Sequence, residues 1–206
     1  MEYSNDGDLL KYVKTNGKIP EDKARFFFKH IAIGLSHIHC WSVLHWDIKL
    51  DNVLLDTEGG VKLCDFGVSK ILKKDQVIKE QCGTPAYIAP EIISEDGYSG
   101  FAVDVWSLGV LLYAMLCGTV PFKATNMKDL HTLINKGEFS FPNPVSSEAS
   151  DLIWKMLIKD PVERISLPEV LNHAWMTRMS DEDFDETDLQ TDVQLSRQKC
   201  AVMTDD

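Results

Sequence analysis

The chain has 206 residues, of which 44% are hydrophobic and 26% are charged. These values are ordinary for a globular protein and exclude a collagen-like or wholly disordered chain. With 21 basic and 32 acidic residues the formal charge is −11, which argues against a general nucleic-acid binder and suits basic partners.

The first half of the chain predicts one long helix after a polar start. A short amphipathic piece lies at 8–13. Pro20, followed by Glu21 and Asp22, is typical of the first turn of a helix. Apolar residues then recur at helical spacing, which predicts a helix of about twenty residues with one buried face. These residues are Phe27, Phe28, Ile31, Leu35 and Ile38.

Two short apolar runs, 53–56 and 61–64, flank the turn-forming residues 57–60, and this pattern predicts a β-hairpin. Residues 68–90 have a mixed pattern that is typical of a loop. The fold class is therefore expected to be mainly α with a small β-hairpin.

Residues 103–117 are apolar on all sides, which predicts a helix packed at the centre of the fold. The apolar part is too short for a membrane span, so we expect no membrane partner. Shorter amphipathic helices are expected at 127–136, 147–157 and 167–173. Residues 179–206 are rich in Asp and Glu and are interpreted as an acidic, disordered tail.

Three motifs follow one another between the long helix and the central helix. The string HWDIKLDN at 45–52 has the spacing H-x-D-x-x-x-x-N, the string DFG lies at 65–67, and APE lies at 89–91. In this order, with a hairpin between the first two, they resemble the catalytic half of the protein kinase family. The string GTPAY at 83–87 resembles Ser/Thr rather than Tyr kinases, and the style is closest to the calcium/calmodulin-dependent kinase group.

The resemblance covers residues 1–178 and implies the large C-terminal lobe of a kinase, from the hinge onward. No G-x-G-x-x-G string and no β3 lysine occur in the chain, so the N-terminal small lobe is interpreted as missing. The implied activity is transfer of the ATP γ-phosphate to Ser or Thr of protein substrates, although this truncated chain is expected to be inactive. The alternative is a pseudokinase-like, non-catalytic protein-binding module.

The resemblance also implies roles for residues at the motifs. Asp47 would orient the substrate hydroxyl and accept its proton, Lys49 would neutralise the γ-phosphate, and Thr84 would tie the two together. Asn52 and Asp65 would bind Mg²⁺, which prefers oxygen ligands.

Further implied roles concern the nucleotide. The backbone of Glu2 and Tyr3 would bond adenine, and Leu54 would form the apolar floor beneath it. Asp8 lies where a ribose-binding carboxylate is usual. Its alternative interpretation is a solvated residue at the start of a helix.

Structural roles are implied as well. His45 and Phe66 are expected to pack together, and Asp104 to accept hydrogen bonds from the backbone of the catalytic loop. Glu91 and Arg164 are expected to form a buried ion pair.

Two positions depart from the family pattern. Trp46 stands where the family usually has an Arg that pairs with a phosphate on the activation loop. Position 80, where that phosphate commonly sits, is Glu. Both sides of the phosphate switch have changed together, so the sequence predicts that a complete version with both lobes would have activity that is independent of loop phosphorylation.

The expected partners are protein substrates that are basic around the phosphorylated residue, with no nucleic acid. Asp8 and Asp51 match positions that carry carboxylates in kinases preferring arginine at −3, whereas Ala114 replaces the acidic residue that reads arginine at −2. The alternative is that Asp8 contacts only ribose and Asp51 only solvent. Five cysteines without a CxxC pair indicate no zinc site. No signal peptide is visible, and the expected location is cytoplasmic. The pattern indicates no particular oligomeric state.

Overall fold

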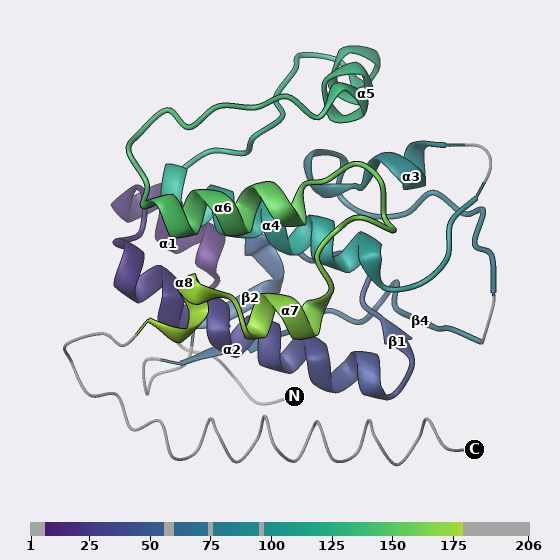
Figure 1. Cartoon of the computed structure of the whole chain (residues 1–206), viewed down its shortest axis with the longest axis horizontal. Helices are drawn as coiled ribbons and strands as arrows, with labels where there is room; N and C mark the ends of the chain where they lie inside the picture. The colour runs from purple at the N-terminus through teal and green to yellow at the C-terminus, as the bar shows by residue number, and fades with distance from the viewer. Residues whose placement is uncertain (1–6, 56–59, 74–75, 95–96, 179–206) are drawn as a thin grey trace.

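The structure is a computed structural model that describes residues 7–55, 60–73, 76–94 and 97–178 (Figure 1). It confirms a mostly helical fold with small sheets. In chain order the helices and strands are α1 (Leu9–Asn16), α2 (Glu21–Cys40), β1 (Val43–Leu44), η1 (Leu50–Asn52), β2 (Val53–Leu55), β3 (Val61–Leu63), β4 (Lys70–Ile71), η2 (Pro85–Tyr87), α3 (Pro90–Ile93), α4 (Ala102–Cys117), α5 (Met127–Lys136), α6 (Ser147–Met156), α7 (Leu167–Leu171) and α8 (Ala174–Thr177).

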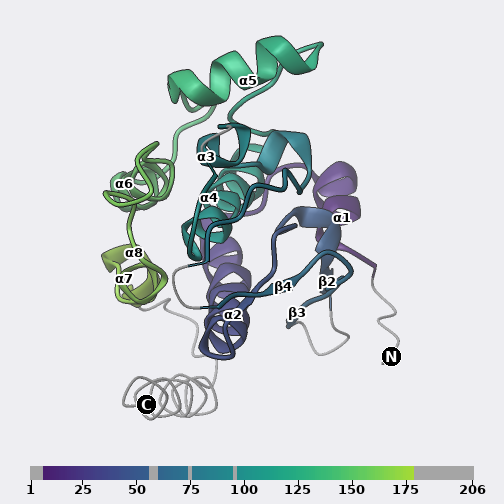
Figure 2. The same ribbon diagram turned by 90° about the vertical axis from the view of Figure 1, so that its right-hand side faces the viewer.

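Helix α4 forms the centre of the core, as its apolar sequence predicts. Every residue from Val103 to Cys117 is buried. Figure 2 shows α6, α7 and α8 on one side of α4 and α2, with the strands on the other. Helix α4 ends at Gly118, whose left-handed backbone (φ 71°) lets its N–H bond the carbonyl of Ala114.

Helix α2 confirms the prediction of twenty residues with one buried face, and it begins directly after Pro20. Helix α1 is longer than the amphipathic piece predicted at 8–13. It continues to Asn16 because the Asp8 carboxylate caps its first turn, and the N–H of Gly17 closes its last turn on Val13.

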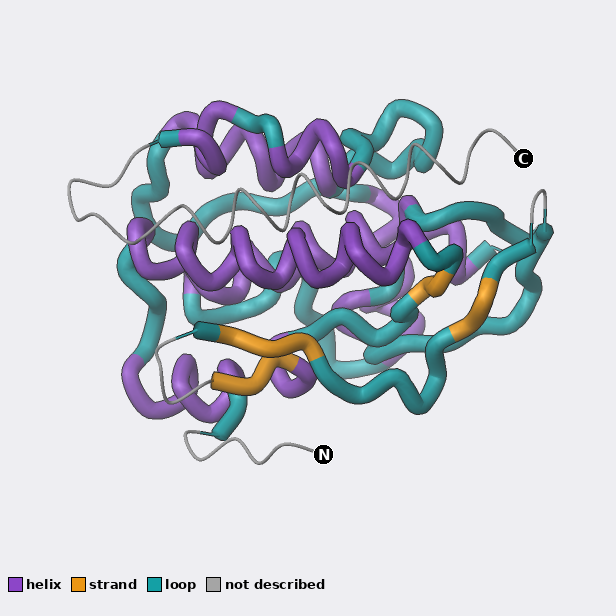
Figure 3. The backbone as a smooth tube through the Cα atoms, turned by 90° about the horizontal axis from the view of Figure 1, so that it is seen from below, coloured by secondary structure: helices purple, strands orange, loops and turns teal. Residues whose placement is uncertain are grey.

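The predicted hairpin is confirmed by the antiparallel pairing of β2 with β3, in which Val53 lies opposite Leu63. Its predicted turn falls largely outside the described residues. Figure 3 shows this hairpin beside α2, and a second small sheet in which β1 pairs with β4. The prediction of a loop throughout 68–90 is therefore wrong at β4 and η2, because elements this short carry no readable periodicity.

Arg164 joins the later helices to α3, which contains Glu91. Its guanidinium forms two parallel hydrogen bonds to the Glu91 carboxylate, of 2.6 and 2.9 Å. The Arg164 side chain is completely buried, and it also donates to three backbone carbonyls. These are the carbonyls of Ala102, Ile158 and Lys159. All five guanidinium donors are thus used, as burial of this charge requires.

Within the described part of the chain, no helix is long and apolar enough to cross a bilayer.

Gly109 is a position where α4 packs tightly against α6, and it generates a stability prediction. A Cβ added at Gly109 would lie 2.8 Å from the Met156 Cβ, so Gly109→Ala forces the helices apart. We expect a loss of about 1–3 kcal/mol in the free energy of unfolding, measured by urea titration. The matched control is Gly34→Ala in α2, where a Cβ meets nothing within 4 Å. Its expected effect is a gain of about 0.5–1 kcal/mol. Equal effects of the two changes would contradict the packing argument.

Candidate active site

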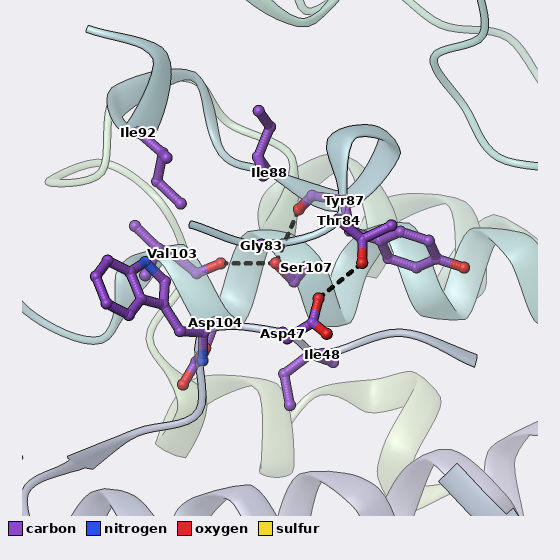
Figure 4. Close-up of a pocket in the computed structure, with 11 residues that line it drawn as sticks. Asp47, Ile48, Gly83, Thr84, Tyr87, Ile88, Ile92, Val103, Asp104 and Ser107 are labelled. Carbon is purple, nitrogen blue, oxygen red and sulfur yellow. Dashed lines mark hydrogen bonds between the residues drawn. The ribbon is translucent and has the colours of Figure 1, made fainter. Parts of the chain in front are cut away.

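The residues that the motifs single out as catalytic meet in one hydrogen-bonded group. The Thr84 hydroxyl donates to Oδ1 of Asp47 at 2.7 Å, and Figure 4 shows the two side chains pointing toward each other. The Lys49 ammonium lies 2.7 Å from Oδ2 of Asp47 and donates to the Thr84 hydroxyl at 3.0 Å. Segments more than thirty residues apart in the sequence thus form one triangle of side chains.

Asn52 holds the other end of the catalytic loop. Its side-chain amide donates to the backbone carbonyl of Asp47 at 2.9 Å and to Oδ2 of the same residue at 3.1 Å. Asn52 is buried at the end of η1, next to β2. The short helix η1 therefore fixes the distance between Asp47 and the hairpin.

Asp47 is ionised at neutral pH. Partial burial favours the neutral acid and raises its pKa, but the hydrogen bonds from Lys49 and Thr84 and the charge of Lys49 outweigh this effect. The pKa of Asp47 therefore lies below its ordinary value. The stabilisation from these bonds is complete at neutral pH and is lost as the pH falls through the pKa of the folded state.

Asp104, in the first turn of α4, anchors the loop from below. Its carboxylate accepts the backbone N–H groups of His45 at 2.9 Å and Trp46 at 2.8 Å. Trp46 has a left-handed backbone with φ 72°, which a bulky residue rarely adopts. The buried carboxylate compensates for this strain, and it confirms the backbone contact predicted for Asp104.

His45 is completely buried and neutral. Burial lowers its pKa, and this effect exceeds the opposing attraction of Asp104. Its Nδ1 accepts the N–H of Asp47 at 3.3 Å, so its Nε2 carries the proton and donates to the carbonyl of Cys64 at 3.1 Å. The ring of Phe66 lies 5.0 Å from that of His45, which confirms the predicted contact, although Phe66 is 47% exposed.

The two residues predicted to bind Mg²⁺ flank the hairpin at the same end, Asn52 directly before β2 and Asp65 shortly after β3. The N–H of Cys64 donates to the Asn52 carbonyl at 2.9 Å, and Asp65 follows directly. Asp65 is exposed and has a left-handed backbone with φ 63°. Its Oδ1 accepts the N–H of Gly67 at 3.2 Å.

This donor set fits a hard cation. Because the Asn52 amide nitrogen bonds Asp47, its oxygen is the atom left to act as a ligand, alongside the Asp65 carboxylate. Mg²⁺ takes one or two carboxylates and completes its shell with phosphates and water. Among the described residues, no three His, Cys, Asp or Glu side chains gather into a metal-binding cluster.

The predicted nucleotide residues are brought together in part. Asp8 and Leu54 form an isolated antiparallel bridge, and the N–H of Leu55 donates to the Gly7 carbonyl at 2.9 Å. Asp8 also caps α1 through a 2.7 Å bond from the Lys11 N–H, so it lies at the start of a helix. Glu2 and Tyr3 lie outside the described residues.

Two further residues contact the groups around the site, and no sequence pattern predicts their contacts. His39 lies in the last turn of α2, and its Nε2 is 2.9 Å from Oδ2 of Asp104. Lys70, in β4, forms a 2.6 Å ion pair with Glu80. A histidine in a helix and a lysine in a loop are ordinary surface residues in a sequence, and only the pairing of distant segments shows their partners.

The wall of the pocket beside Asp47 comes from the segment before α3 and from α4. Figure 4 shows Ser107 between the Tyr87 carbonyl, to which its hydroxyl donates at 2.8 Å, and Val103. Tyr87 is buried, and burial raises its pKa to about 12. Ser107 thereby ties the strand-like segment around Thr84 to the central helix.

Comparisons with known proteins agree with this geometry. The family model described as Protein kinase domain matches residues 1–176. The chain is 44% identical over 175 residues to the serine/threonine protein kinase OSK3 of Oryza sativa subsp. indica, a match that covers 85% of this chain and 34% of OSK3. It is 43% identical over 175 residues to an SNF1-related protein kinase catalytic subunit of Arabidopsis thaliana, covering 85% of this chain and 35% of the relative. The chain thus spans about a third of the length of these curated relatives.

The hydrogen bond from Thr84 generates a prediction for the pKa of Asp47. Thr84→Val removes an O–H donor that favours the ionised carboxylate, so the pKa of Asp47 rises. The shift is measured by NMR titration of the Asp47 carboxyl carbon. Thr84→Ser keeps the hydroxyl and serves as the matched control, with a smaller rise or none. A pKa that stays the same in Thr84→Val would show that this bond does not control the ionisation.

Proposed function

The chain belongs to the Ser/Thr protein kinase family, and from this premise we propose that it is the catalytic region of a kinase that phosphorylates Ser or Thr of protein substrates. The observation that carries the proposal is the Asp47–Lys49–Thr84 triangle, in which an ionised carboxylate is held between a cation and a hydroxyl. Within the family we propose that the chain lies beside the calcium/calmodulin-dependent kinase group, on the style of the sequence as a whole.

The proposed chemistry depends on position and charge more than on covalent help. Asp47 orients the substrate hydroxyl and accepts its proton as that oxygen attacks the γ-phosphorus of ATP. Lys49 neutralises negative charge on the γ-phosphate as its bond to ADP breaks. Thr84 bonds both side chains, so it sets the distance between the proton acceptor and the cation.

We propose that Asn52 and Asp65 hold Mg²⁺, and that Asp8 and Leu54 contact the ribose and adenine of ATP. Bound Mg²⁺ would supply charge neutralisation at the phosphates. Support comes from the oxygen donors at the end of the hairpin and from the bridge between Asp8 and Leu54. The adenine contacts proposed for the Glu2 and Tyr3 backbone rest on the family resemblance alone.

We also propose that residues 1–178 act as one kinase lobe and that residues 179–206 are a separate acidic tail. The 206 residues contain neither a glycine-rich phosphate loop nor a β3 lysine. We therefore expect no measurable phosphoryl transfer from this chain alone. Transfer is expected when the chain is joined to the small lobe of a Ser/Thr kinase relative.

The catalytic assignment is tested on this two-lobed form. Asp47→Asn removes the proton acceptor but keeps the side chain's shape, and we expect kcat for a peptide substrate to fall at least about 100-fold. The matched control is Asp22→Asn, a side chain that is 77% exposed in α2, which leaves kcat unchanged. The measurement is incorporation of radiolabelled phosphate from ATP.

Two outcomes would contradict the proposal. Asp47→Asn with normal kcat would show that Asp47 is not the proton acceptor. A two-lobed form that binds substrate peptides without any transfer would instead favour the non-catalytic binding module.

The proposed substrate class is a protein with Arg at −3 from the phosphorylated residue and no requirement at −2. Asp51 is exposed beside the catalytic loop, where a carboxylate can bind a guanidinium in a bidentate manner. Ala114 is buried in α4 and offers no carboxylate for an arginine at −2.

A positional peptide array on the two-lobed form is expected to show higher kcat/KM with Arg at −3, by about tenfold. Asp51→Ala is expected to remove most of this preference, while the exposed control Glu163→Gln keeps it. A preference that survives Asp51→Ala would move the recognition of Arg to another residue.

A further inference from the structure

Trp46 lies at the centre of a group of contacts that the catalytic chemistry does not use. We define the Trp46 cluster as Trp46, Lys70, Glu80 and Tyr98. The Trp46 ring is buried, and the Lys70 ammonium lies 5.6 Å from its centroid, within the range of a cation–π contact. The same ammonium lies 2.6 Å from the Glu80 carboxylate. One cation therefore contacts both residues that depart from the family pattern.

Tyr98 contacts both Trp46 and Glu80. Its ring lies edge-on to Trp46 with centroids 6.3 Å apart, and its hydroxyl donates to the Glu80 carbonyl at 3.0 Å. The backbone of Tyr98 also exchanges two hydrogen bonds with Ile78, of 2.7 and 2.9 Å. The segment 78–84 is thus attached to the cluster at two points before it reaches Thr84.

Gly83 brings the same segment into direct contact with the catalytic loop. A Cβ at Gly83 would lie 3.0 Å from the Trp46 carbonyl, and its φ of 113° belongs to glycine. The next residue, Thr84, bonds Asp47. If the segment moved away from Trp46, Thr84 would move with Gly83, and its hydrogen bond to Asp47 would be disturbed.

The hydroxyl groups near the segment are already engaged. Between Asp65 and Pro85 the sequence holds only Ser69 and Thr84 as hydroxyl residues. The Ser69 hydroxyl donates to the His45 carbonyl at 3.3 Å, and the Thr84 hydroxyl donates to Asp47. The negative charge opposite Lys70 comes from the Glu80 side chain itself and needs no modification.

We propose that Trp46, Lys70 and Glu80 are positioning residues that hold segment 78–84 against the catalytic loop permanently, without a phosphate. This inference rests on the proposed kinase function and names the regulation of that site. Lys70 contributes through two contacts at once, the Trp46 face and the Glu80 carboxylate. A neutral side chain at position 80 or 70 removes the ion pair. At position 70 it also removes the cation over the Trp46 ring, and at position 80 it removes the carboxylate that orients this cation.

The test on the 206-residue chain measures hydrogen–deuterium exchange of peptides that cover 78–84. Glu80→Gln and Lys70→Met are expected to speed this exchange about two- to fivefold, the modest effect of a partly exposed ion pair. Lys70→Arg keeps the charge and the stacking and should restore slow exchange. Lys136→Met, which breaks the exposed pair with Glu138, is the matched control and should leave 78–84 unchanged.

Salt separates an electrostatic role from a packing role. Raising the ionic strength from about 0.1 to 1 M shortens the screening length roughly threefold, so exchange of 78–84 should quicken in the unmodified chain. In Glu80→Gln the same salt change should have no effect on these peptides. Two results would overturn the proposal. One is that residues 78–84 exchange at the same rate in Glu80→Gln as in the unmodified chain. The other is that they exchange faster in Lys70→Arg than in the unmodified chain.

The regulatory part is measured on the two-lobed form. Phosphatase treatment should leave its activity unchanged, whereas Glu80→Gln should lower kcat several-fold. A loss of more than tenfold after phosphatase treatment would overturn independence from phosphorylation. If no variant shows transfer but the exchange results hold, the kinase proposal fails while the positioning role of the cluster stands.

Discussion

The loop that carries Asp47 depends on one buried carboxylate. Asp104 is completely buried at the first turn of α4, and it accepts two consecutive backbone N–H groups of the loop. Burying a charge without hydrogen-bond partners is costly, and these two N–H groups offset that cost. Asp104 also lies near the N-terminus of α4, where the helix dipole favours a negative charge. Because α4 is immobilised by the core on all sides, the carboxylate is immobile too. The strained backbone of Trp46 and the placement of Asp47 both follow from that rigidity.

Arg164 provides a second constraint at the first turn of α4. Arg164 bonds the Ala102 carbonyl, at the first residue of α4, and pairs with Glu91 just after η2. Its guanidinium also lies over the Trp106 ring at 5.1 Å. The start of α4 therefore fixes the position of two segments. Asp104 fixes the loop that carries Asp47. Arg164, which bonds both Ala102 and Glu91, fixes the segment that carries Thr84. The two halves of the Asp47–Lys49–Thr84 triangle meet because they are fixed to a common element.

The sequence predicts elements whose signal is local and long, and these agree with the structure. Apart from Asp104 and Ser107, residues 103–117 are apolar on all sides, and this pattern predicts a central helix that buries them. The motifs also identify Asp47 and Thr84, yet their spacing says nothing of the 2.7 Å bond between them. The sheet of β1 and β4 was not predictable, because two residues per strand show no alternation. The roles of His39 and Lys70 depend on partners far along the chain, which periodicity cannot reveal.

The contact of Lys70 with both Trp46 and Glu80 also constrains how this chain can change over evolutionary time. An arginine introduced at position 46 alone would place a second cation beside Lys70, with one carboxylate between them. Like charges repel, so this substitution is disfavoured in the present background. Neutralising Lys70 first would leave Glu80 without its cation. Single changes at positions 46 and 70 are therefore each opposed, and we expect substitutions at positions 46, 70 and 80 to affect one another.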